Sequence, residues 1–312
     1  MPPHPTITVP AKLAELHTRY HGDSTGPSWI AGLPRLATEF LDRWQLRQDG
    51  APMHGMVALV LPVVRSDGAR AALKFQPVDE ESVGEPVALR AWDGDRAVRL
   101  LDHDAESGTM LLERLDAGRS LAHVADAEAA LMDLSELLAH LVARPAPAGL
   151  RTLADIAAAM LDDVPEALPA LRDPAERELL RRCAEAVREV LDEPGDRLLH
   201  WDLHYENVLA PPPGSGRGAW LAIDPKPLAG DAGFDLMPAL DNRWDDIVAT
   251  GDVHRAVRRR FDLMTEVVGL DRERAARWTL GRVLQNSLWD VEDGEHALRP
   301  EQAAVARALL AR

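Results

Sequence analysis

The chain has 312 residues, and 46% of them are hydrophobic, which is enough for a sizeable core and excludes a globally disordered protein. Its 51 Asp and Glu against 35 Lys and Arg give a net charge of −16, which argues against a protein that binds the phosphate backbone of nucleic acids. The single cysteine, Cys183, excludes an intrachain disulfide framework. The longest apolar run, residues 56–64, is too short for a membrane span, and the N-terminus has no basic region followed by an apolar stretch. We therefore expect a cytoplasmic protein with no membrane partner.

The first third of the chain has a strand-rich pattern. We predict strands at residues 44–49, 57–64, 69–76, 97–101 and 109–115. Asp67-Gly68 gives a strong hairpin signal between the second and third of these. Residues 79–92 are predicted to form one helix, in which Ser82 and Glu85 fit a capping box and Pro86 is tolerated in the first turn.

After residue 115 helical periodicity predominates. Helices are predicted at residues 122–143, 153–171, 174–191, 255–268, 272–291 and 301–310. Asp173 stands before Pro174 as an N-cap before a proline. Two short strands, 197–201 and 220–223, interrupt the helices, and the Pro- and Gly-rich loop between them suggests a small hairpin.

This pattern predicts an α+β fold in two lobes. Residues 1–115, with an N-terminal helical arm, would carry a five-stranded antiparallel sheet and one helix. Residues 116–312 would be mainly helical. A site between the two lobes is the first place to look for a bound ligand.

The densest group of chemically active side chains lies in residues 200–209, His-Trp-Asp-Leu-His-Tyr-Glu-Asn-Val-Leu. Asp202 and Asn207 have the Asp-x-x-x-x-Asn spacing of a kinase catalytic loop, and Asp224 follows the next predicted strand. Asp202 could accept the proton of an attacking hydroxyl group, while Asn207 and Asp224 offer the oxygen ligands that Mg²⁺ prefers. The alternative is a loop whose side chains only hydrogen-bond the backbone.

Lysine is scarce, since Lys12, Lys74 and Lys226 are the three in the chain. Lys74 lies near the end of the predicted strand 69–76, where its ammonium group could offset the charge of nucleotide phosphates; an exposed strand lysine is the alternative. Its partner should be a carboxylate on the next helix, and Glu85 is the first choice and Glu81 the second. Lys226 could neutralise a phosphate or simply lie at the surface.

The usual phosphate-binding loops are missing. No Gly-x-Gly-x-x-Gly precedes the hairpin, so a different backbone within residues 50–57 would have to cover the phosphates, with Gly55, Met56 and Val57 as candidates. No Gly-x-x-x-x-Gly-Lys-Ser/Thr occurs, which excludes a P-loop NTPase. Further nucleotide-binding candidates, at the lobe boundary and after the catalytic loop, are Glu113, Leu115, Leu209 and Ile223.

Several stretches together resemble the aminoglycoside phosphotransferase branch of the kinase-like superfamily, and within it the aminoglycoside/hydroxyurea antibiotic resistance kinases. These stretches are Ala-Ala-Leu-Lys (71–74), Leu-Arg-Ala-Trp (89–92), Ala-Val-Arg-Leu-Leu-Asp-His-Asp (97–104), Met-Leu-Leu-Glu-Arg-Leu-Asp (110–116), His-Trp-Asp-Leu-His-Tyr-Glu-Asn-Val-Leu-Ala (200–210), Ala-Ile-Asp-Pro-Lys-Pro-Leu-Ala-Gly-Asp (222–231), Phe-Asp-Leu-Met-Pro-Ala-Leu-Asp (234–241) and Leu-Gln-Asn-Ser-Leu-Trp-Asp-Val-Glu-Asp-Gly (284–294). The likeness spans residues 30–312, although many related kinases have Gly where Trp201 stands.

The resemblance implies a bilobal protein-kinase-like fold, with a nucleotide-binding lobe in residues 1–115 and the catalytic loop and substrate site in residues 116–312. It implies ATP-dependent phosphorylation of the 6-hydroxyl group on the streptidine ring of streptomycin, and hence antibiotic resistance. Asp202 would be the catalytic base, Asn207 and Asp224 would hold Mg²⁺, and Lys74 would contact phosphates. Asp235 and His200 would have structural roles, Asp235 by bracing the catalytic loop.

Streptomycin carries two guanidinium groups and an amine, which pair with carboxylates and stack on aromatic rings. The substrate-binding candidates are accordingly Glu206, Asp241, Trp244, Asp245, Trp289, Asp290 and Asp293. Each of them could instead be an ordinary surface carboxylate or core tryptophan. We expect a monomer.

Two alternatives stay open from the sequence. One is a kinase of another small hydroxylated compound, such as hydroxyurea. The other is a catalytically inactive nucleotide-binding module, although the intact Lys74, Asp202, Asn207 and Asp224 argue against it. A protein kinase is disfavoured, because neither Asp-Phe-Gly nor Ala-Pro-Glu is present to bound an activation loop.

Overall fold

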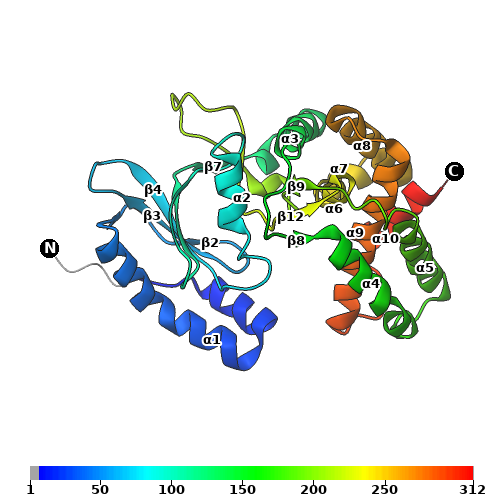
Figure 1. The fold of residues 1–312 in the computed structure, drawn as a ribbon, viewed down its shortest axis with the longest axis horizontal. Coiled ribbons are helices and arrows are strands. Elements are labelled where there is room, and N and C mark those ends of the chain that lie inside the picture. The colour runs from blue at the N-terminus through cyan, green and yellow to red at the C-terminus, as the bar shows by residue number, and fades with distance from the viewer. Residues whose placement is uncertain (1–6, 312) are drawn as a thin grey trace. The chain divides into compact units, whose positions relative to one another are not determined.

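The computed structural model describes residues 7–311, except for the side chains of residues 20–25, and divides into two compact units. The first unit comprises the chain up to Leu115 together with Pro211–Ser215, and the second comprises Asp116–Ala210 and the chain from Gly216 onward. Each unit has its own strands and helices (Figure 1). Among the described residues no helix is both long enough and apolar enough to cross a membrane.

An antiparallel sheet forms the centre of the first unit, in the order β1-β3-β4-β6-β5, and β2 also pairs with β3. The strands are β1 (Arg47–Gln48), β2 (Met53–His54), β3 (Leu59–Val64), β4 (Arg70–Phe75), β5 (Leu100–Asp104) and β6 (Thr109–Glu113). The prediction gave five strands, whereas the described sheet has six. The additional strand, β2, lies inside the predicted loop 50–56 and is only two residues long, too short to show an alternating pattern.

A long helix, α1 (Ala11–Arg43), packs on this sheet (Figure 1). Leu33, Phe40 and Leu41 of α1 join Leu61 and Phe75 of the sheet in one buried hydrophobic cluster. The segment that was expected as a helical arm is thus the helix α1, and it is part of the core of the unit. The helix predicted beside the sheet is a separate one.

The second helix of this unit, α2 (Glu85–Trp92), is shorter than the predicted 79–92. Its N-cap is Gly84 rather than Ser82, and Pro86 lies in its first turn. The Ser82 hydroxyl instead donates to the Pro77 carbonyl at 2.8 Å and accepts from the Asp79 amide at 2.9 Å. The predicted capping box is therefore wrong, because Ser82 stabilises the turn before the helix and the Glu85 carboxylate has another partner.

The second unit is mainly helical. Its α-helices are α3 (Ala127–Leu141), α4 (Leu153–Ala167), α5 (Pro174–Arg188), α6 (Met237–Asp241), α7 (Trp244–Val248), α8 (Val253–Val268), α9 (Arg272–Glu292) and α10 (Pro300–Leu310). Asp173 caps α5 as predicted, with its side chain accepting from the Ala175 amide at 2.8 Å. α9 is buried along much of its length and packs against α4, α5 and α10. This helix is the central support of the unit.

Two small three-stranded sheets hold the loops of the second unit. One has the order β11-β10-β7 and the other β8-β12-β9. Their strands are β7 (Asp116–Ser120), β8 (Arg151–Thr152), β9 (Arg197–Leu199), β10 (Val208–Ala210), β11 (Leu221–Ala222) and β12 (Leu228–Gly230). The predicted hairpin between 197–201 and 220–223 is wrong, because β11 pairs with β10 and β9 pairs with β12. Residues 200–207 thus leave one sheet and enter the other, and both ends of this segment are fixed.

Candidate active site

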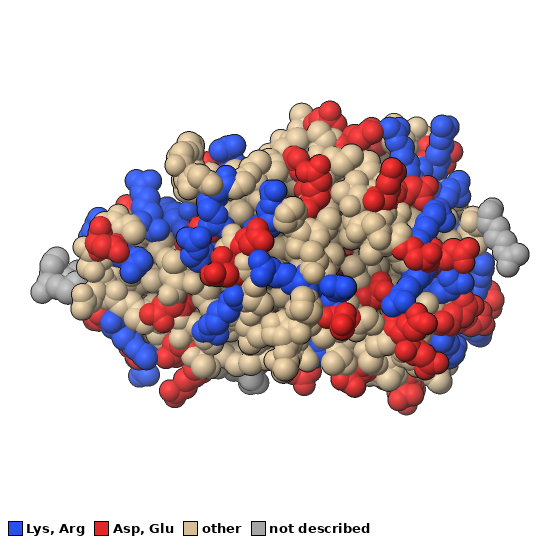
Figure 2. All heavy atoms as spheres, turned by 45° about the horizontal axis from the view of Figure 1, so that its top comes forward, with Lys and Arg blue, Asp and Glu red and all other residues tan. Residues whose placement is uncertain are grey.

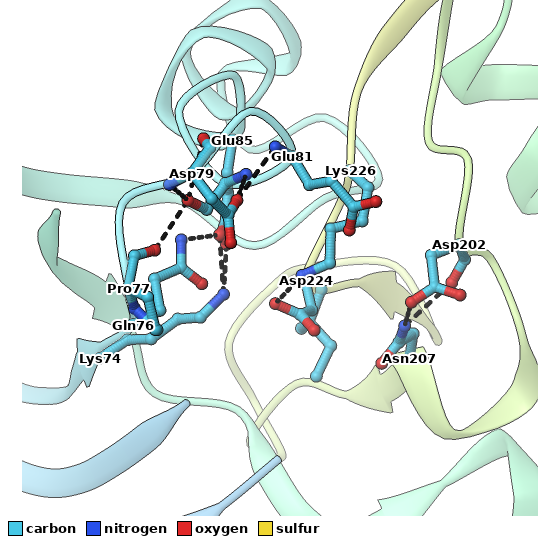
Figure 3. Close-up of polar contacts among 12 residues, drawn as sticks. Lys74, Gln76, Pro77, Asp79, Glu81, Glu85, Asp202, Asn207, Asp224 and Lys226 are labelled. Carbon is cyan, nitrogen blue, oxygen red and sulfur yellow. Dashed lines mark hydrogen bonds and ion pairs between the residues drawn. The ribbon is translucent and has the colours of Figure 1, made fainter. Parts of the chain in front are cut away.

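In the first unit, β4 and α2 together bury an ion pair. Lys74 lies on β4, and its Nζ is 2.8 and 2.7 Å from Oε1 and Oε2 of Glu85, the first residue of α2 (Figure 3). Gln76 adds a third hydrogen bond to the same carboxylate, from its Nε2 to Oε2 at 2.7 Å. The Lys74 and Glu85 side chains are 5% and 0% exposed. Glu85 rather than Glu81 is therefore the carboxylate partner of Lys74.

The other candidates of the first unit lie on two segments. Gly55 and Met56 are exposed in the turn between β2 and β3, where the Gly55 amide donates to the Ala58 carbonyl at 3.0 Å. The neighbouring Val57 carbonyl accepts from Nε2 of His17 on α1 at 2.8 Å. This hydrogen bond anchors one end of the turn to the long helix.

At the end of β6, the amide and the carboxylate of Glu113 both have Arg99, the residue before β5, as their partner. Its amide donates to the Arg99 carbonyl at 2.9 Å, and its carboxylate accepts from the Arg99 amide at 2.8 Å. Leu115, the last residue before the second unit, is buried. The Glu113 amide therefore already donates a hydrogen bond within the protein.

In the second unit, Asp235 holds the start of the catalytic loop (residues 200–207). Its two carboxylate oxygens accept from the amides of His200 at 2.8 Å and Trp201 at 2.6 Å. Asp235 is fully buried, and burial raises its pKa to about 7, although the two amide hydrogen bonds and the nearby Arg282 act in the opposite direction. This is the bracing contact that the resemblance implied for Asp235.

His200 ties the catalytic loop to the strand that precedes Asp224. Its Nε2 donates to the Ile223 carbonyl at 3.0 Å, and its Nδ1 accepts from the Asp202 amide at 3.3 Å. Complete burial lowers the pKa of His200 to about 3, so the ring stays neutral. The neutral ring has one donor and one acceptor nitrogen, and each has a suitable partner. His200 is therefore a structural residue of the loop.

Asp202 and Asn207 face each other across the loop (Figure 3). Nδ2 of Asn207 donates to the Asp202 carbonyl at 2.9 Å and to its Oδ2 at 3.3 Å. This orientation leaves the Asn207 amide oxygen as a possible metal ligand. Burial raises the pKa of Asp202, while His204 and Arg282 act to lower it. A raised pKa makes a carboxylate a stronger proton acceptor.

Asp224 follows β11, which a backbone hydrogen bond from the Ile223 amide to the Asn207 carbonyl (2.9 Å) fixes beside the loop. Oδ1 of Asp224 is 3.6 Å from Nζ of Lys226 (Figure 3). Ile223 is half-buried, as is Leu209 on β10. The described residues contain no group of three or more His, Cys, Asp or Glu side chains placed to hold a metal. An amide oxygen and a carboxylate still fit Mg²⁺, which takes one or two carboxylates and completes its shell with water and phosphates.

A second polar group joins the end of the loop to the residues after α6 and contains two of the substrate-binding candidates. Glu206 accepts from His204 at 2.8 Å and from Nδ2 of Asn242 at 3.1 Å, and its pKa is lowered to about 2, chiefly by the His204 hydrogen bond. Asp241, which precedes Asn242, has its pKa raised to about 6 by burial, against the opposing charges of Arg282, Arg299 and His204. Glu206 and Asp241 therefore lie in one neighbourhood with His204.

The remaining candidates divide into two sets. Trp289 on α9 is 38% exposed, and its ring centroid lies 5.9 Å from that of Trp201, so it belongs to the catalytic-loop region. The Asp290 carboxylate pairs with Arg299 at 2.8 Å, so its charge is already matched. Among the described contacts none ties Trp244 or Asp245 to this region. Asp293, the C-cap of α9, contacts it through its backbone amide, which donates to the Trp289 carbonyl at 2.9 Å.

The structure also brings together residues that the sequence did not single out. Arg282 on α9 approaches the Trp201 ring and acts on the charges of Asp202, Asp235 and Asp241. One arginine in a helix rich in arginine carries no distinguishing signal. Asn242 was equally hidden, since its role depends on where α6 ends.

Comparison with known proteins places these features in a family. Residues 43–294 match the family model described as aminoglycoside/hydroxyurea antibiotic resistance kinase. The chain is 60% identical to a streptomycin 6-kinase of Streptomyces glaucescens over 97% of both chains. It is 58% identical to a hydroxyurea phosphotransferase of Kitasatospora aureofaciens, over 98% of this chain and 87% of the relative.

The fold is also found in solved structures. An aminoglycoside phosphotransferase, crystallised as a thermostable mutant in a ternary complex with ADP and hygromycin B, superposes with a TM-score of 0.56 at 14% identity, covering 88% of this chain and 98% of the other. Identity this low supports the kinase-like fold alone. Together with the family match over most of the chain, it leads to one conclusion: this protein is a phosphotransferase that belongs to the aminoglycoside/hydroxyurea antibiotic resistance kinases.

Proposed function

We propose that this protein transfers the γ-phosphoryl group of ATP to the 6-hydroxyl group on the streptidine ring of streptomycin and so inactivates the antibiotic. The observation that carries the proposal is the Asp202–Asn207 pair in a loop braced by Asp235, in a chain 60% identical to a streptomycin 6-kinase. The first unit binds the nucleotide and the second binds the acceptor. The active form is a monomer.

In this proposal each polar residue of the site has one task. Asp202 accepts the proton of the attacking hydroxyl group, and its raised pKa suits that task. Asn207 and Asp224 hold Mg²⁺, which neutralises charge on the phosphates when it is bound. Lys74, fixed by Glu85, contacts the nucleotide phosphates. Catalysis by such an arrangement consists of positioning and charge neutralisation.

The acceptor site suits a cation. Glu206 is ionised at neutral pH because its pKa is about 2, and Asp241 is largely ionised because its pKa is about 6. The half-exposed Trp289 adds an aromatic surface near the loop. Acidic and basic side chains are interspersed over the face of the protein in Figure 2, so local carboxylates rather than the net charge account for this preference. A guanidinium group can pair with such carboxylates and stack on the ring.

Hydroxyurea is the second candidate acceptor, because a hydroxyurea phosphotransferase is 58% identical to this chain. Hydroxyurea is small and uncharged, so it has no cationic group to pair with the carboxylates of Glu206 and Asp241. The composition of the acceptor site therefore favours streptomycin.

The test is an assay of the purified protein with ATP, Mg²⁺ and each acceptor separately, followed by mass spectrometry. We expect streptomycin to gain one phosphoryl group and NMR to place it on the 6-hydroxyl group. The Asp202→Asn variant should lose about 10²- to 10⁴-fold in kcat. Asp196→Asn is the matched control, since Asp196 is an exposed aspartate whose carboxylate pairs loosely with Arg197 at 3.7 Å. Phosphorylation of hydroxyurea alone would overturn the proposed substrate.

A further inference from the structure

Trp201, the residue before Asp202, has an unusual backbone conformation. Its φ is +66°, in the left-handed region that glycine occupies without cost, and its side chain is 2% exposed. A bulky residue at such a φ is strained, and the conformation persists only where its surroundings fix it. The conformation of this peptide also sets the direction in which the next residue, Asp202, leaves the backbone.

Two guanidinium groups hold the Trp201 ring from different elements. The Cζ atoms of Arg151, on β8, and Arg282, on α9, lie 4.6 and 4.8 Å from the ring centroid. Cation–π contacts of this kind are stabilising, and more so where water is excluded. The two contacts together can offset the strain at Trp201.

Hydrogen bonds complete the arrangement. The Trp201 amide donates to Asp235 at 2.6 Å, and its indole Nε1 donates to Oε1 of Gln285 at 3.2 Å. The same Gln285 oxygen accepts from Nη1 of Arg282 at 2.7 Å. Gln285 therefore ties the ring of Trp201 and one of the two guanidinium groups to a single point on α9.

We propose that Trp201, Arg151, Arg282 and Gln285 form a clamp that positions the Asp202 carboxylate for phosphoryl transfer. They are positioning residues, since each acts through Asp202 without contacting the reacting atoms. The inference rests on the proposed function, in which Asp202 is the catalytic base. Trp201 is thus kept at a strained backbone position because its ring gives the loop contacts that glycine would not provide.

Steady-state kinetics of the full-length protein with ATP, Mg²⁺ and streptomycin test the clamp. Trp201→Gly relieves the backbone strain but removes the ring, and we expect kcat to fall at least about tenfold while KM for ATP changes less than about twofold. Trp201→Phe keeps an aromatic ring for both guanidinium groups to contact and should restore most of kcat. Arg151→Met removes one of the two cation–π contacts and should lower kcat without changing KM for ATP.

The matched control is Trp278→Leu. Trp278 is also a fully buried tryptophan of the second unit, on α9, and it packs against Phe234. This variant should lose stability but keep the kcat of the wild type, and an equal loss of kcat would show general loosening and overturn the proposal. Wild-type kcat in Trp201→Gly would also overturn it. Asp202→Asn separates the two ideas: full activity there refutes the base itself, whereas an inactive Asp202→Asn with an active Trp201→Gly refutes only the clamp.

Discussion

Substitution of Glu85 by Gln should destabilise the first unit strongly. The Glu85 carboxylate accepts two hydrogen bonds from Lys74 and one from Gln76, and it is completely buried. Glu85→Gln keeps the volume but removes the negative charge that lies 2.7 Å from the Lys74 ammonium, which is 5% exposed. Removal of one partner from a buried ion pair costs about 3–5 kcal/mol. We expect about 3 kcal/mol, because the introduced amide still offers one oxygen to Lys74.

The assay is urea denaturation combined with hydrogen exchange of the amides in β4 and α2. Exchange in these elements should accelerate, while α9 of the second unit keeps its protection. The double variant Lys74→Met, Glu85→Gln removes the buried ammonium as well and should recover at least half of the lost free energy of unfolding. A loss below about 1 kcal/mol in Glu85→Gln, or a double variant as unstable as the single one, would refute the reasoning.

Three further outcomes are expected. Asp241 has a pKa of about 6, so its carboxylate is ionised above pH 6 and becomes neutral below it. KM for streptomycin should therefore rise as the pH falls through 6, and Asp241→Asn should make KM less dependent on pH in this range. Cys183 is buried and its pKa is raised to about 12, so it should react with a thiol reagent only after unfolding by urea; rapid labelling of the native protein would contradict this. Gly230→Ala would place a methyl group 2.7 Å from Cβ of Leu153, which should lower the free energy of unfolding by about 1–3 kcal/mol. An unchanged midpoint of thermal or urea denaturation would show that the small sheet shifts to accommodate the methyl group.

The catalytic loop was readable from the sequence because its residues are close together in the chain. Asp202 and Asn207 are five positions apart, and their spacing alone singled them out as candidates; the hydrogen bond between them appears in the structure. The pair of Lys74 and Glu85 was also predictable, because a strand and the helix that follows it in the chain bring the two side chains together. In these cases short-range geometry was sufficient.

The failures have a common cause in short elements. β2, β8 and β11 have two residues each, and hydrophobic periodicity gives no signal over that length. Their partners are selected by tertiary packing, so the predicted hairpin joined the wrong strands. The predicted capping box failed because of another tertiary contact. The Glu85 carboxylate pairs with the buried Lys74 and is therefore not used to cap the helix.

The sequence by itself determined the α+β composition, the long helices after residue 115 and the residues of the catalytic loop, because these depend on local periodicity and spacing. Only the tertiary structure decided that α1 is part of the core, that β9 pairs with β12, and that Arg151 and Arg282 meet on the ring of Trp201. These contacts join residues far apart in the chain. They are stabilised by burial in the folded protein, and a local sequence pattern does not predict which distant residues are buried together. The backbone strain at Trp201 is tolerated for the same reason: distant side chains fix it.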